Sequence, residues 1–184
     1  MRAWLIALVC AVPAIAHADD TRPLPKHRWA ADAMFVLPVD RYAEDADGGI
    51  GALARYEYRI GSKLSLTARG GPLFHLTDRD GSSLFMFLAL AGMRYNLDPD
   101  QESGTFFSMA IGMNYVRVAF EAMGVKASDS EPELTLDIGG GFQVSRFQIR
   151  ASVFYTPHVG ASFAGDAVSY LGLALTFGYD FSLR

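Results

Sequence analysis

Charged side chains recur at alternate positions in segments that are otherwise apolar or small, and this spacing limits the chemistry they could do. Asp32 stands between two alanines, and Arg94 stands between Met93 and Tyr95. A period of two places successive side chains on opposite faces of a β-strand. Five positive and four negative groups on one shared face could neutralise one another in ion pairs. The set is Asp32, Arg55, Glu57, Arg59, Arg69, Arg94, Asp137, Arg150 and Asp180.

Two histidines carry the same parity as these charges, near one end of the predicted strands. A metal site at His75 and His158 would need further ligands, and the nearby acids show no recognisable ligand spacing. Those acids are Asp78, Asp80 and Asp166. We therefore interpret both histidines as polar residues at a rim, and we expect no metal site.

A catalytic relay has equally little support. His158, Ser162 and Asp166 contain the residue types of a nucleophile, a base and an acid, but they match no motif that would bring them together. The only cysteine, Cys10, lies in the N-terminal segment. We nominate no catalytic residue, no cofactor-binding residue and no cofactor, and we expect a protein that is not an enzyme.

Eight segments show the alternation that would position these side chains. In the last of them, Leu171, Leu173, Leu175 and Phe177 share one face, while small and polar residues occupy the other. Alternation of this kind predicts strands with one apolar and one polar face. The predicted strands are 29–39, 50–60, 63–75, 84–97, 105–121, 134–144, 147–156 and 168–183.

The connections between these strands alternate in length. Short links follow the second, fourth and sixth strands, and longer ones follow most of the others, the longest polar loop being 124–133. Transmembrane barrels alternate short periplasmic turns with longer extracellular loops, so both termini are expected in the periplasm. We also predict an irregularity at Pro72 and a bulge near Arg117.

The N-terminus has the three parts of a secretory signal peptide. Arg2 supplies a positive start, an apolar run follows, and Ala16-His17-Ala18 forms a small-x-small cleavage site. We predict a signal peptide over 1–18, a flexible segment over 19–28 that contains two prolines, and a single barrel domain over 29–184.

The composition narrows the class of protein further. Hydrophobic residues make up 51% of the chain, yet none of them forms a run long enough for a membrane-spanning helix. Hydrophobicity spread over alternate positions is typical of a transmembrane β-barrel. The formal net charge of −4 makes nucleic acid an improbable partner. The fold class is therefore all-β, an eight-stranded antiparallel up-and-down transmembrane barrel with a polar, plugged interior.

The strand pattern and its end signature resemble the small eight-stranded outer-membrane barrels that include the OmpA transmembrane domain and OmpX. One departure is the terminus Phe181-Ser182-Leu183-Arg184, since members typically end on an aromatic residue. The resemblance implies localisation in the bacterial outer membrane, contact with outer-membrane lipid and lipopolysaccharide, and insertion by the barrel assembly machinery, as a monomer. We therefore expect a structural, envelope or surface-interaction role through the extracellular loops, with the loop ligand unassigned.

Three alternatives remain open from the sequence. The first is a narrow channel or a small-ligand-binding barrel. The second is a lipid A-modifying enzyme, although the His-x-Ser pair of the deacylases is absent after both His75 and His158. The third is a soluble periplasmic barrel of the lipocalin kind, in which the apolar faces would point inward.

Overall fold

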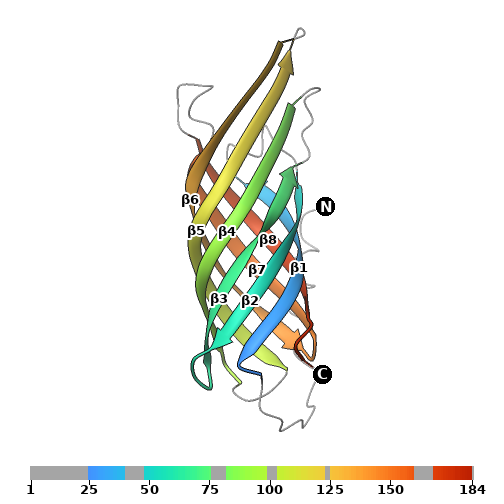
Figure 1. The fold of residues 1–184 in the computed structure, drawn as a ribbon, viewed down its shortest axis with the longest axis vertical. Helices are drawn as coiled ribbons and strands as arrows, with labels where there is room; N and C mark the ends of the chain where they lie inside the picture. Colours follow the sequence, from blue (N-terminus) through green and yellow to red (C-terminus); the bar gives the residue numbers. More distant parts are fainter. Residues whose placement is uncertain are drawn as a thin grey trace.

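The alternating segments form a closed antiparallel barrel (Figure 1). The computed structural model describes residues 25–39, 48–75, 82–98, 103–122, 125–159 and 168–183. The strands are β1 (His27–Val39), β2 (Gly49–Arg59), β3 (Leu64–His75), β4 (Ser82–Asn96), β5 (Gly104–Ala122), β6 (Val125–Val144), β7 (Phe147–Val159) and β8 (Val168–Asp180). Each strand pairs with its neighbours in sequence, and β1 pairs with β8, which closes the barrel. The predicted fold class is confirmed.

The two faces of the strands differ as the alternation predicts. Large apolar side chains point outward, and Phe107, Ile138 and Phe147 are 56%, 61% and 64% exposed. Charged side chains such as Arg55 and Asp137 are buried inside the barrel. A soluble barrel would bury its apolar faces instead, so the lipocalin-like interpretation is wrong.

Two strands extend into segments that the sequence predicts to be flexible or a loop. The segment 19–28 was expected to be flexible, but β1 begins at His27, because its backbone pairs with Tyr58 of β2. Residues 124–133 were expected to form a polar loop, but β6 begins at Val125 and pairs with β5 from Ala122 onward. Backbone pairing with β5 keeps this part of β6 in the sheet, although its sequence has no apolar face.

One predicted irregularity in the strand pairing is absent, and another is found where none was predicted. The pairing of β5 runs without a shift through Arg117, so the expected bulge is absent there. The pairing of β7 with β8 shifts by one residue between Thr156 and Val159, on either side of Pro157. Near Pro72 the β2–β3 pairing is interrupted while its register is kept, which agrees with the predicted irregularity.

The paired strands β4, β5 and β6 rise beyond the rest of the barrel at one end (Figure 1). β5 and β6 stay paired up to Ala122 and Val125, and β4 accompanies β5 as far as Phe120. On the other side of β6, pairing with β7 begins only at Leu136. The strands β4, β5 and β6 therefore form a protruding sheet, and we refer to residues 125–135 as its β6 edge.

Several predicted features lie outside the described residues. These are the signal peptide 1–18, most of the segment 19–28, and Cys10, Asp78, Asp80, Ser162 and Asp166.

Candidate functional site

The inward charges form a network in the half of the barrel that carries the short β2–β3 and β6–β7 turns. Its centre is Glu57 on β2, which is 1% exposed. One carboxylate oxygen of Glu57 contacts Arg55 and lies 3.0 Å from Nη1 of Arg94. The other lies 3.4 Å from Nη1 of Arg28. One carboxylate thus faces three guanidinium groups from three strands.

The closing strands β1 and β8 each add a carboxylate to this network. Arg55 donates from Nε to Asp32 Oδ2 at 3.1 Å. Arg28 donates from Nε to Asp180 Oδ2 at 2.7 Å, and its Nη2 lies 2.5 Å from the same oxygen. Gln148 of β7 also donates to Asp32, over 3.4 Å. These bonds link the first, second, seventh and eighth strands across the closure of the barrel.

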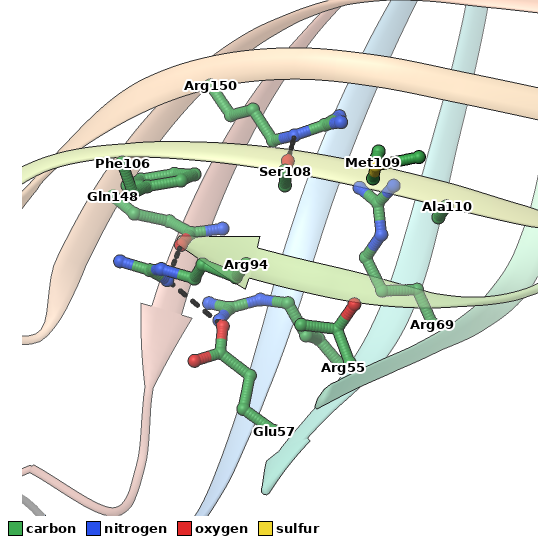
Figure 2. Close-up of a pocket in the computed structure, with 11 residues that line it drawn as sticks. Arg55, Glu57, Arg69, Arg94, Phe106, Ser108, Met109, Ala110, Gln148 and Arg150 are labelled. Carbon is green, nitrogen blue, oxygen red and sulfur yellow. Dashed lines mark hydrogen bonds and ion pairs between the residues drawn. The ribbon is translucent and has the colours of Figure 1, made fainter. Parts of the chain in front are cut away.

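A second group of charges surrounds Asp137 on β6. Its Oδ2 lies 3.0 Å from Nη2 of Arg69, and both its oxygens accept from Arg150. Arg150 also donates from Nε to the hydroxyl of Ser108 at 2.7 Å (Figure 2). Asp137 is 1% exposed, so its two arginines neutralise a charge that is removed from water.

Arg94 uses all three of its guanidinium nitrogens. Its Nη2 donates to Gln143 at 2.6 Å, its Nη1 to Gln148 at 3.1 Å and its Nε to Asn96 at 2.8 Å. Its guanidinium carbon lies 3.7 Å from the centre of the Phe106 ring, in a cation–π contact. Figure 2 shows Arg94 between Glu57 and Gln148, which fixes its position in the lumen.

The space left between these groups is small. A cavity of about 20 Å³ lies among them, and four arginines, 55, 69, 94 and 150, line part of its wall. A site needs roughly 10–15 Å³ to hold one water molecule. The cavity thus has room for about one water, and it is too small for an organic substrate.

The opposite half of the lumen is mainly apolar. Buried side chains from β1 to β5, β7 and β8 pack together there, and they are Met34, Val36, Leu53, Leu73, Leu84, Met86, Leu88, Val116, Phe154, Tyr170 and Ala174. Beside them, the Tyr170 hydroxyl lies 3.2 Å from Nε2 of His75. The interior therefore has two layers, the charge network and this apolar cluster.

The structure places the predicted site residues in two environments. Eight of them are buried in the charge network: Asp32, Arg55, Glu57, Arg69, Arg94, Asp137, Arg150 and Asp180. Arg59 is half-buried, and its guanidinium donates to the carbonyls of Gly61 and Ser62 in the β2–β3 turn. A side chain near the end of a strand can reach a turn instead of the lumen.

Sequence reasoning missed Arg28. It lies four residues before Asp32 and shares its parity, but we had placed it in the flexible segment. His75 is buried against Tyr170, so it is an interior residue and not one at an exposed rim. The side chain of His158 lies outside the description. Within the described ranges, no three His, Cys, Asp or Glu side chains gather as a metal site requires.

The architecture and the distribution of polarity define a class of protein. A closed eight-stranded barrel with an apolar outer surface and charges inside has the design of a transmembrane β-barrel. The part of the chain described here contains no helix long and apolar enough to cross a membrane.

Comparison with known proteins supports this class at the level of the fold. No model of a protein family matches the chain, and no curated protein sequence matches it. Among solved structures, it is similar to Ail, the attachment invasion locus protein of Yersinia pestis, with 16% identity over 84% of this chain and 97% of Ail, at a TM-score of 0.63.

Two further solved structures share the architecture. Neisserial surface protein A is 14% identical over 85% of this chain and 98% of that protein, with a TM-score of 0.54. The N-terminal β-barrel domain of Pseudomonas aeruginosa OprF is 10% identical over 84% of this chain and 97% of that domain, with a TM-score of 0.55. The chain has the fold of the small bacterial outer-membrane β-barrels, and its predicted localisation agrees with that fold.

Proposed function

We propose that the protein is a non-enzymatic outer-membrane barrel that acts at the cell surface by presenting its protruding sheet to extended polypeptide. The observation that carries the proposal is the β6 edge, whose pairing with β5 is complete while its described pairing with β7 starts only at Leu136. An unpaired strand edge offers a row of backbone donors and acceptors, to which an extended segment of another chain can add as a further strand.

Pro132 identifies the free side of this strand. It pairs with Tyr115 of β5 in an unbroken register, although proline has no N–H to donate. Within sheets, proline is tolerated where its nitrogen faces away from a neighbouring strand. We infer that the nitrogen of Pro132 faces the free side. Alternate residues share this orientation, so the N–H groups of Ser128 and Ser130 face the same way.

The charge of the β6 edge favours a basic partner. Residues 125–135 contain one lysine against three acidic residues, namely Asp129, Glu131 and Glu133. An extended segment that carries positive charge would therefore associate faster and in preference to an acidic one.

The structure of the interior supports a role as a scaffold and not as a catalyst or a channel. The charge network engages its carboxylates with arginines, and the apolar cluster fills the other half of the lumen. The proposal includes export through a signal peptide over 1–18, insertion by the barrel assembly machinery, contact with lipopolysaccharide in the outer leaflet, and a monomeric state. In this orientation the protruding sheet is extracellular and the short turns are periplasmic.

The test uses a synthetic probe. A ten-residue peptide of alternating valine and lysine is titrated against the refolded full chain in micelles, with a peptide of equal composition and two internal prolines as control. We expect the alternating peptide to bind and the proline-containing control peptide not to bind. The substitution Ser128→Pro should abolish binding of the alternating peptide while the barrel stays folded. Equal binding of both peptides, or full binding to the Ser128→Pro variant, would contradict the proposal.

A further inference from the structure

A groove crosses the outer surface of the barrel from β2 to β5. Its volume is about 700 Å³, and small side chains form its floor: Ala54, Ala68, Gly70, Ala89 and Ala91. The register explains this shape, because Ala68 pairs with Ala91 and Gly70 pairs with Ala89 in neighbouring positions on β3 and β4. Three strand spacings separate β2 from β5, so the groove is about 14 Å long.

Large side chains close the groove at its two ends. Ile111 and Met113 of β5 lie at one end, and Trp29 and Tyr56 lie at the other, where their ring centres are 4.6 Å apart. The lining is almost entirely apolar on a surface that faces lipid. A recess of this kind offers a hydrocarbon chain more contact than a flat barrel wall does.

A lysine and a histidine lie beside the Trp29 end. Nδ1 of His27 lies 2.7 Å from the hydroxyl of Tyr56, the same tyrosine that lines the groove. Nζ of Lys26 lies 5.1 Å from the centre of the Tyr58 ring, and His27 packs against that ring as well. The side chains thus run continuously from the groove to the exposed His27 and the exposed ammonium group of Lys26.

The charge beside the Trp29 end of the groove is suited to binding an anion. Lys26 is charged at neutral pH, and its interaction with Tyr58 raises its pKa further. The carboxylates of the same strand ends, Glu57 and Asp180, are 1% exposed and point into the lumen. Neither of these two carboxylates therefore lies on the outer face beside the groove, where it could neutralise the positive charge of Lys26.

We propose that this face binds one glycerophospholipid, with its phosphate at Lys26 and His27 and one acyl chain in the groove. An ammonium group and an imidazole N–H both donate to phosphate oxygens in charge-assisted bonds. Trp and Tyr favour the level where lipid headgroups meet hydrocarbon. Trp29 and Tyr56 at this level would place the phosphate on the headgroup side and the acyl chain on the hydrocarbon side. In the proposed orientation the lipid belongs to the periplasmic leaflet.

The site is independent of the proposed surface function. It lies on the outer wall at the end with the short turns, whereas the β6 edge lies at the opposite end of the barrel (Figure 1). Failure of one proposal leaves the other untouched.

Tryptophan fluorescence provides the test. The chain contains two tryptophans, so Trp4→Phe leaves Trp29 as the only one. The refolded Trp4→Phe chain is titrated in detergent micelles with phosphatidylglycerol or phosphatidylcholine whose acyl chains carry bromine, a contact quencher. We expect Trp29 to be quenched at a lower mole fraction of the anionic lipid. Equal quenching by both lipids would overturn the headgroup assignment.

Matched variants separate the headgroup from the chain. Each basic residue near a membrane surface contributes about 1 kcal/mol of attraction, which is about fivefold in binding. We expect Lys26→Ala to weaken phosphatidylglycerol binding about fivefold, and Arg146→Ala, a cation in the β6–β7 turn that contacts Tyr179, to weaken it less. Equal effects of the two substitutions would overturn the assignment of the phosphate.

The groove is tested by filling it. Ala89→Phe should reduce quenching by both lipids, whereas Ala151→Phe, an exposed outward position on β7, should not. Circular dichroism confirms that both variants fold. Equal quenching of the two variants would overturn the acyl-chain site. A change from dimer to monomer on Ala89→Phe, seen by cross-linking, would also overturn it, because the groove would then hold a second copy of the chain.

Discussion

Replacement of Glu57 by glutamine is the most direct test of the charge network. The substitution keeps the size of the side chain and removes the charge that Arg28, Arg55 and Arg94 share. Glu57 is 1% exposed, so bulk water cannot solvate the three guanidinium groups once the carboxylate is removed. Removing one partner of a buried ion pair costs about 3–5 kcal/mol, because a charge remains buried without compensation.

The assay is equilibrium unfolding of the refolded Trp4→Phe barrel by urea in lipid vesicles, followed by the fluorescence of Trp29. We expect Glu57→Gln to lower the free energy of unfolding by about 3–5 kcal/mol. Glu133→Gln is the matched control, because Glu133 is half-buried and carries the same charge. It should change stability by no more than about 0.5 kcal/mol. If both variants lost less than about 1 kcal/mol, the network would not stabilise the fold and the reasoning would be refuted.

The remaining predictions concern packing, the turn and the lumen. Gly178→Ala would place a methyl group against the Asp32 carboxylate, so we expect a loss of about 1–3 kcal/mol, with the uncrowded Gly61→Ala as a neutral control in the same unfolding assay. Leu88→Ala should cost about 2–5 kcal/mol, since this side chain is fully buried in the apolar cluster, and a loss near zero would contradict that packing. Arg59→Gln should cost about 1 kcal/mol, the usual net contribution of a hydrogen bond, because the half-buried guanidinium donates to two carbonyls of the β2–β3 turn. In planar bilayers the protein should show no steady conductance, and regular openings would contradict a filled lumen.

Alternation in the sequence was sufficient to predict the strands, the closure and the direction of most charges. The reason is that one face of each strand meets lipid and the other meets the lumen, so a period of two is imposed along the membrane-spanning part. Asp32 and Arg94 could be placed inside from this rule alone. Their particular partners could not, because pairing between distant strands depends on the stagger of the whole barrel.

The features that were missed have physical causes. Beyond the membrane both faces of a strand meet water, so residues 125–133 of β6 show no apolar period and their sequence predicts a polar loop. In β4, apolar residues occupy both faces from Leu84 to Ala91, and alternation gives no contrast there. The inward positions Met86 and Leu88 therefore escaped notice, and with them the apolar layer of the lumen.

The two layers of the interior suggest why the charges are concentrated in one of them. An apolar lumen and an apolar outer wall would make the two faces of a strand alike, so a slip by one residue would cost little. In the charged layer the same slip would turn Arg55, Arg94 or Arg150 toward lipid, at a cost per arginine that rises from about 0–1 kcal/mol near the interface to about 2–4 kcal/mol at the bilayer centre. The slipped strand would also leave Glu57 and Asp137 without their arginines. We infer that the charge network fixes the strand register, while the apolar cluster fills the lumen.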